Sequence, residues 1–141
     1  MTLRRYASRK SHQPEMLVDS TIYIELLRRG EDLPFVLRPY LVNNQLFTCG
    51  VVRVEVLRGI RSIHLRDEIS DLLDLMNEIP TNGQVWRETV KLAWTLDRRG
   101  IVLPLTDIVI ACCAIHFSTP VVSTDPHFSK VPGLVVQRSL S

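Results

Sequence analysis

A short apolar run that ends in an acid, residues 16–19, constrains the fold of this chain more than any other segment. Met16-Leu-Val has the length and composition of a buried strand, and after Asp19 the apolar residues return at helical spacing. The pattern therefore predicts that Asp19 lies at the carboxyl end of a strand, which in an open α/β sheet is the edge where ligands bind. The simpler alternative is that Asp19 or Ser20 only caps the helix that follows. The choice depends on whether other acids come to the same edge.

The size and composition of the chain suit one folded domain. A length of 141 residues is enough to bury a core, and we expect a flexible basic arm over residues 1–14 and the domain over residues 15–141. No apolar run approaches the roughly 20 residues that span a bilayer, and the first residues lack the apolar region of a signal peptide. We therefore expect no membrane partner and a cytoplasmic location. The three cysteines form neither a disulfide framework nor a zinc-binding pattern.

The positive charge of the chain is concentrated at its start. Residues 1–15 contain four basic side chains and one acid, a balance of +3, so the net charge of +2 leaves the rest of the chain at −1. A nearly neutral domain lacks the concentrated basic face of a nonspecific DNA-binding protein. The arm could contact RNA, or it could be an incidental extension that precedes a true start at Met16.

Strands and helices are expected to alternate along the chain. The predicted strands after the first one cover residues 45–49, 119–123 and 134–137, and the predicted helices cover residues 20–29, 35–43, 51–59, 62–79, 84–99 and 103–115. Residues 51–59 also alternate like a strand, but Gly59 suits a helix stop and a helix repeats the first strand-to-helix junction. Helices 62–79 and 84–99 are expected to pack together as a helical hairpin. The alternation predicts an α/β fold with a parallel sheet flanked by helices.

Four acids are predicted to meet at the carboxyl edge of this sheet. They are Asp19, Glu55, Asp107 and Asp125, and each follows apolar residues at a strand end or stands near a helix start. Two carboxylates about 5 Å apart repel by roughly 3 kcal/mol at an effective dielectric of 20, so a cluster needs protons or cations. Oxygen ligands without nearby Cys or His select Mg²⁺ or Mn²⁺, ions that suit phosphate substrates.

Four segments around these acids, with a Val-Pro-Gly-Leu tail, resemble the PIN domain, specifically the VapC-type toxins of toxin–antitoxin pairs. The segments and the tail are residues 17–27, 54–59, 105–111, 121–128 and 131–134. They stand in the same order and at suitable spacing, and the resemblance extends from Met16 to about residue 136. It implies a three-layer α/β/α sandwich and a metal-dependent endoribonuclease.

The resemblance also implies roles for individual residues. Asp19, Glu55 and Asp107 would be the principal metal-binding acids, and Asp125 would complete the catalytic site. Supporting hydroxyls are expected at Thr21 and Ser123. The alternative for Ser123 is that its hydroxyl only satisfies hydrogen bonds at the end of the strand. Thr106, next to Asp107, is expected to support the site or to cap its helix, and His127 is expected to lie on the surface.

The expected partners follow from the same resemblance. An RNA substrate is expected, and Arg28, Arg53 and Arg58 could hold its phosphates because they lie near the acids in the sequence, although each could equally be a solvent-exposed arginine without that role. A cognate antitoxin would cover the acidic site, and a homodimer is expected. Two other functions stay open: a PIN-like module that binds RNA or protein without cutting, and a housekeeping RNA-processing nuclease. All four acids are retained, which favours an active enzyme.

Overall fold

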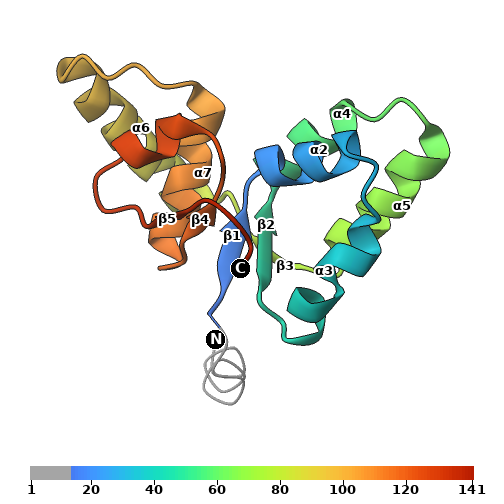
Figure 1. Cartoon of the computed structure of the whole chain (residues 1–141). Coiled ribbons are helices and arrows are strands. Elements are labelled where there is room, and N and C mark those ends of the chain that lie inside the picture. The colour runs from blue at the N-terminus through green and yellow to red at the C-terminus, as the bar shows by residue number, and fades with distance from the viewer. Residues whose placement is uncertain (1–13) are drawn as a thin grey trace.

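A parallel five-stranded sheet forms the centre of the molecule, as a computed structural model of residues 14–141 shows (Figure 1). The strand order is β3-β2-β1-β4-β5. The strands are β1 (Met16–Val18), β2 (Leu46–Cys49), β3 (Asn77–Ile79), β4 (Val121–Val122) and β5 (Val136–Gln137). The predicted arm, residues 1–14, falls outside the described residues except for Pro14.

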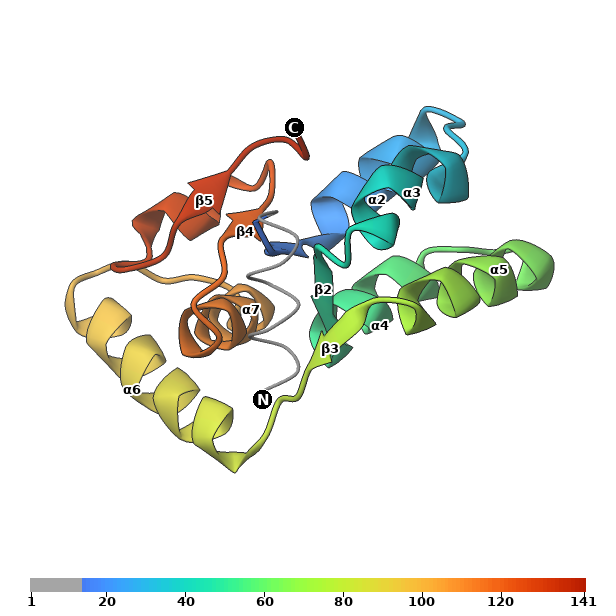
Figure 2. The same ribbon diagram turned by 90° about the horizontal axis from the view of Figure 1, so that it is seen from below.

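Helices cover both faces of this sheet. The helices are α2 (Ser20–Arg28), α3 (Leu33–Val42), α4 (Gly50–Arg58), α5 (Ile63–Asp74), α6 (Gly83–Arg98), α7 (Leu105–His116) and the 3₁₀ helix η1 (Pro126–Lys130). Helices α2, α3, α4 and α5 lie on one side of the sheet, and α6 and α7 lie on the other (Figures 1 and 2). The predicted three-layer α/β/α sandwich with a central parallel sheet is confirmed. Among residues 14–141, no helix is both long and apolar enough to cross a membrane.

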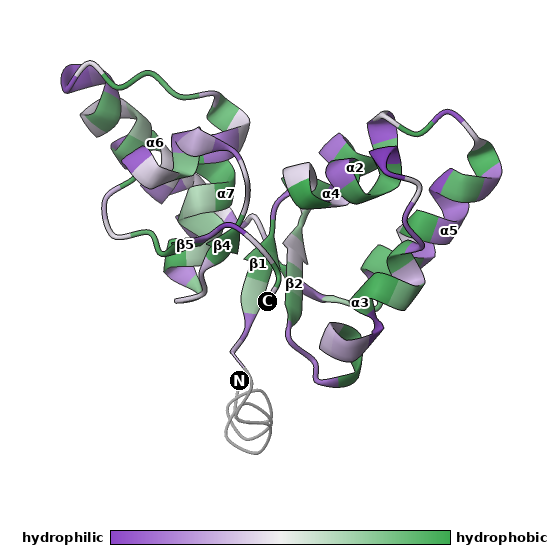
Figure 3. Ribbon diagram, in the orientation of Figure 1, coloured by the Kyte–Doolittle hydropathy of each residue, from purple (hydrophilic) through white to green (hydrophobic). Residues whose placement is uncertain are grey.

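The middle of the sheet is buried on both faces, which explains its continuous apolar sequence. Every residue of β1 and β2 is buried, and so is the stretch of α7 from Asp107 to Ala114. Figure 3 shows hydrophobic residues along β1, β2 and α7. Strands that helices cover on both sides need no polar face, so β1 and β4 can present their polar groups only where they end. That edge carries the candidate site.

The structure corrects the prediction for residues 62–79. The helix ends at Asp74, and Asn77–Ile79 form the edge strand β3, which pairs with β2. Since Met76 and Ile79 are buried, the apolar spacing continued past the end of the helix. The strand is short and includes Asn77 and Glu78, so it has no strand-like pattern of its own.

The predicted helical hairpin is wrong for the same reason. Strand β3 separates α5 from α6 and carries the chain across the sheet, so the two helices lie on opposite faces (Figure 2). Helix α5 packs on α4, and α6 packs along α7. The helix that carries Asp107 is therefore supported from outside by α6.

Candidate active site

Asp19 lies at the junction of β1 and α2, and its side chain is only 2% exposed. It is the N-cap of α2, and its Oδ2 accepts from the backbone N–H of Thr21 (3.4 Å), from Thr21 Oγ1 (3.0 Å) and from Ser123 Oγ (2.8 Å). The alternative that Asp19 caps the helix is therefore correct. It uses only one carboxylate oxygen, however, because no donor among the described residues is recorded for Oδ1. Capping and ligand binding are compatible at this residue.

Two hydroxyl groups join the ends of β1 and β4. Ser123 is fully buried, and its Oγ accepts from the backbone N–H of Asp125 (2.9 Å) while it donates to Asp19. Thr21 Oγ1 lies 3.1 Å from Ser123 Oγ and accepts from the backbone N–H of Thr124 (3.2 Å). Both predicted supporting hydroxyls therefore contact the acid cluster. They hold the Asp19 carboxylate and the Asp125 turn in a fixed relation.

We expect Ser123→Ala to lower any activity of this site by roughly 10- to 100-fold, the usual effect of losing a group that orients a metal ligand. The substitution removes a donor from Asp19 and leaves the backbone N–H of half-buried Asp125 without its acceptor. It should also lower the free energy of unfolding by about 1–2 kcal/mol. Urea denaturation and an activity assay measure the two effects. Ser129→Ala is the matched control, because Ser129 is exposed on η1 and donates to the backbone carbonyl of Pro126, and equal activities of the two variants would contradict the assignment.

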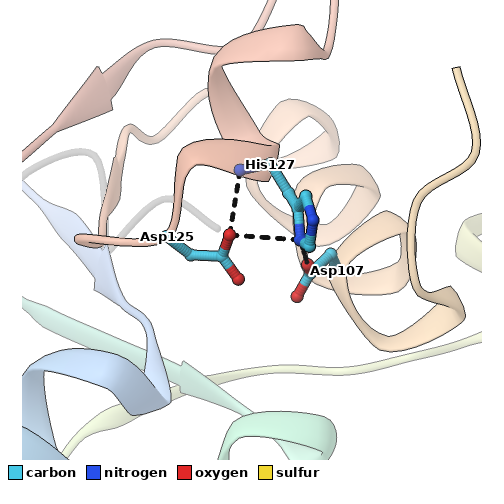
Figure 4. A group of neighbouring side chains, drawn as sticks. All are labelled: Asp107, Asp125 and His127. Carbon is cyan, nitrogen blue, oxygen red and sulfur yellow. Dashed lines mark hydrogen bonds and ion pairs between the residues drawn. The ribbon is translucent and has the colours of Figure 1, made fainter.

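Asp107, Asp125 and His127 form the tightest group of potential metal ligands in the described part of the chain (Figure 4). One ligand atom from each lies within 4.8 Å of the others. His127 Nδ1 donates to Asp107 Oδ2 at 2.8 Å and lies 3.1 Å from Asp125 Oδ1. Asp125 Oδ1 also accepts from the backbone N–H of His127 (2.9 Å) and so caps η1. This turn places the imidazole against both acids.

His127 is the residue that sequence reasoning missed. Its side chain is 37% exposed, so the surface position is correct, but the ring also bridges two of the predicted acids. A signal was present in the sequence, because an Asp followed by Pro favours a turn in which the Asp side chain bonds two residues ahead. That turn brings the side chain of the second residue beside the acid.

The electrostatics of Asp107 reflect a crowded acidic site. The pKa of its carboxyl is raised to about 6, first by burial and then by the nearby carboxylates of Asp125 and Asp19, against the hydrogen bond from His127, which lowers it. Asp19, at the end of β1, is thus close enough to Asp107, at the start of α7, to act on it electrostatically. No Lys or Arg within residues 14–141 is recorded as pairing with these acids. The donors are oxygens plus one imidazole and lack a cationic partner, so a divalent cation fits the site.

Glu55 is connected to Asp19 indirectly, through a residue of α2. It lies half-buried on α4, and its Oε1 accepts from the hydroxyl of Ser20 (3.0 Å), the residue after Asp19. The expected helix over residues 51–59 is present as α4, so the acid stands on the second turn, as predicted. Glu55 is thus connected to Asp19 through the neighbouring residue Ser20, whereas Asp107 and Asp125 are connected through His127.

The remaining predicted residues are less closely tied to the acids. Thr106 is exposed in the first turn of α7 and does not cap the helix, because Pro104 is the N-cap. Arg28 pairs with Glu25 (2.9 Å) and Arg53 pairs with Asp74 (2.6 Å). Arg53 and Arg58 line an open groove of about 710 Å³ beside α4, together with Arg66. The roles of these residues in RNA binding stay predictions.

Comparison with known proteins agrees with this geometry. The family model of the PIN domain matches residues 16–134, and the chain therefore belongs to the PIN domain family. No curated protein sequence matches the chain closely enough to count as a relative.

Solved structures share the fold at low sequence identity. VapBC2 from Rickettsia felis, solved with a promoter DNA fragment, is 17% identical with a TM-score of 0.72 over 86% of this chain and 96% of the other. DNA-bound VapBC from Salmonella typhimurium is 15% identical with a TM-score of 0.73 over 89% and 98%. VapBC-1 from nontypeable Haemophilus influenzae is 21% identical with a TM-score of 0.70 over 86% and 96%. At these identities the likeness shows the fold.

Proposed function

We propose that this chain is a divalent-metal-dependent endoribonuclease that acts as the toxin of a toxin–antitoxin pair. The observation that carries the proposal is the group of Asp19, Asp107 and Asp125, with Glu55 at its border, at the carboxyl edge of a PIN-family sheet. Asp107 and Asp125 lie together in one group of potential metal ligands, Asp19 acts on Asp107 electrostatically, and no Lys or Arg among the described residues is recorded as pairing with these acids. A bound divalent cation would neutralise these carboxylates and relieve their mutual repulsion.

Each residue of the site would have its own role in the reaction. Asp19, Asp107 and Asp125 would hold Mg²⁺ or Mn²⁺, and Glu55 would complete the ligand set or orient a water. The bound cation would lower the pKa of a water molecule and neutralise charge on the scissile phosphate. Ser123 and Thr21 keep Asp19 in place, and His127 holds the orientation of Asp107 through their 2.8 Å contact. Water attack with the 3′ oxygen as leaving group would give a 5′-phosphate and a 3′-hydroxyl.

The toxin assignment rests on the structural relatives. Several of them are toxin–antitoxin complexes by their descriptions, among them one from Klebsiella pneumoniae with 20% identity and a TM-score of 0.66. We propose the same arrangement for this chain, in which a cognate antitoxin covers the acidic edge in the cytoplasm. A basic side chain of the antitoxin would complement the uncompensated carboxylates.

Cleavage of RNA by the purified, antitoxin-free chain tests the proposed function. Total RNA is incubated with Mg²⁺, with Mn²⁺ or with EDTA, and the product ends are mapped. We expect cleavage with either metal, none with EDTA, and 5′-phosphate ends. Binding of RNA without cleavage under any metal would contradict the nuclease and favour a binding module. Cleavage that persists in EDTA would contradict the metal site.

A further inference from the structure

His127 lies against two of the predicted metal ligands, and the nuclease proposal uses it only to orient Asp107. Its Nδ1 lies 2.8 Å from Asp107 Oδ2 and 3.1 Å from Asp125 Oδ1, and Figure 4 shows the ring in contact with both carboxylates. A single N–H carries one proton, so it can bond well to only one of these oxygens. A nitrogen that faces two carboxylates at once also suits a third ligand of a shared cation.

The distances among these three donors match those of one coordination sphere. Two neighbouring ligands of an octahedral ion, each about 2.1 Å from it, stand roughly 3 Å apart. The two distances from His127 Nδ1 to the carboxylate oxygens, 2.8 and 3.1 Å, are close to this value. One ligand atom from each of Asp107, Asp125 and His127 lies within 4.8 Å of the others. A single cation can therefore contact all three residues.

The turn that carries His127 fixes the imidazole in this position. Asp125 Oδ1 accepts from the backbone N–H of His127 at 2.9 Å, and the backbone N–H of Asp125 donates to the buried hydroxyl of Ser123 at 2.9 Å. The next residue, Phe128, is fully buried, and η1 packs on α7, the helix that carries Asp107. Contacts of the backbone and the core therefore place the ring, and a ligand placed in advance loses little conformational entropy when it binds.

The surroundings of the imidazole allow Nδ1 to act as a ligand. A neutral imidazole carries its proton on either nitrogen, and no partner of Nε2 is recorded among residues 14–141. With the proton on Nε2, the lone pair of Nδ1 points to the two carboxylates. The side chains of His127 and Asp125 are 37% and 22% exposed, so a hydrated ion can reach them. Lys130, the other basic residue of η1, is exposed, and no ion pair between it and these acids is recorded.

We propose that His127 is a direct ligand of the metal ion through Nδ1, and that this nitrogen makes the site selective for Mn²⁺ over Mg²⁺. Mg²⁺ is a hard ion that prefers oxygen ligands, whereas imidazole is a good ligand of transition-metal ions. The sequence favoured both ions equally because it indicated oxygen ligands alone, and His127 changes that donor set. In the metal-free protein Nδ1 holds Asp107 by a hydrogen bond, and a bound ion would take the place of the shared proton. The inference rests on the metal site of the proposed function and specifies its ion.

Pulsed electron paramagnetic resonance of Mn²⁺ bound to the purified chain tests the direct bond. The chain is made with isotope-labelled histidine, so that a coupling between Mn²⁺ and a labelled nitrogen identifies an imidazole ligand. We expect this coupling in the wild type and its loss in His127→Asn, because asparagine can place an N–H near the position of Nδ1 but has no ring nitrogen to bind the ion. His64→Asn is the matched control, since His64 is an exposed histidine on α5, and it should keep the coupling.

The ratio of two dissociation constants separates a ligand from a residue that only orients Asp107. The affinity for Mn²⁺ is measured from the signal of free Mn²⁺, and the affinity for Mg²⁺ is measured by competition. We expect His127→Asn to weaken Mn²⁺ binding roughly 10-fold or more and Mg²⁺ binding by less than about 3-fold. His64→Asn should leave both affinities unchanged. An orienting residue would affect both ions equally, so an unchanged ratio in His127→Asn would overturn the proposal.

Failure of this inference is distinguishable from failure of the proposed function. Wild-type protein that binds Mn²⁺ without a coupled histidine nitrogen would overturn the role of His127 and leave the acidic metal site in place. Wild-type protein that binds neither ion would overturn both proposals. The spectrum of the wild type requires no substitution, so it decides the role of His127 even if His127→Asn does not fold.

Discussion

Asp19→Asn is expected to lower RNA cleavage on the order of 10³-fold or more, in a protein that keeps its fold. Asparagine has nearly the same shape and retains one oxygen, which can still accept from Thr21 and Ser123. The substitution removes the negative charge that a divalent cation would need. Cleavage rates with saturating Mg²⁺ and urea denaturation curves measure the two sides of the prediction. Glu55→Gln should lose activity in the same way.

The control for these variants is an acid in a different environment. Asp71 is exposed on α5, on the solvent side of that helix, so Asp71→Asn should keep full activity. An Asp19→Asn protein that cleaves RNA normally would remove Asp19 from the metal site. An Asp19→Asn protein that unfolds would show instead that the negative charge of Asp19 is needed for the fold itself, since asparagine caps a helix as well as aspartate does.

Asp107→Asn is expected to abolish activity and, without metal, to stabilise the protein. The pKa of Asp107 is raised from its ordinary 3.8 to about 6, so the folded protein holds a proton that the unfolded chain releases. The free energy of unfolding therefore falls as the pH rises from about 4 to 6. The change in the pKa of Asp107 corresponds to a loss of at most about 3 kcal/mol in the free energy of unfolding above pH 6. Asparagine removes this cost, and we expect a gain of about 1–3 kcal/mol at pH 8, reduced by the weaker bond to His127.

The measurement is urea denaturation of both proteins in EDTA at pH 4 and pH 8. The two stabilities should be similar at pH 4, and the variant should be the more stable protein at pH 8. Added Mg²⁺ should stabilise the wild type and leave the variant unchanged, because a ligand stabilises only the state that binds it. The competing effect is that an acid in the first turn of α7 interacts favourably with the helix macrodipole, and asparagine would lose this interaction. A less stable variant at pH 8 would therefore assign Asp107 a structural role.

The sequence predicted the acids best where each one stands at the end of a predicted strand or in the first turns of a predicted helix. Asp19 directly follows the buried run of β1, and Asp125 stands three residues after the end of β4, so the positions of the strands placed both acids at the sheet edge. Glu55 depended on the choice of a helix for residues 51–59, and the presence of Gly59 decided it correctly. Because parallel strands end at the same edge, the meeting of these acids followed from the alternation of elements.

The prediction failed where tertiary contacts outweigh local pattern. Strand β3 pairs with β2 through only three residues, and its apolar positions also suited the preceding helix. The contact of His127 with Asp107 spans 20 residues and arises only when η1 packs near α7. The pairing of Arg53 with Asp74 likewise depends on α4 lying beside α5. The local Asp125-Pro126 turn has a sequence signal, but contacts between residues so far apart along the chain do not.

The most direct test of the central claim is Mn²⁺ binding to the wild-type chain, measured by electron paramagnetic resonance of free Mn²⁺ at pH 7.5. The account predicts saturable binding of Mn²⁺ with which Mg²⁺ competes. Asp107→Asn and Asp19→Asn should each weaken this binding at least roughly 10-fold, and Asp71→Asn should leave it unchanged. Equal binding by the wild type and both site variants, or no binding at all, would contradict a metal centre at the carboxyl edge of this sheet.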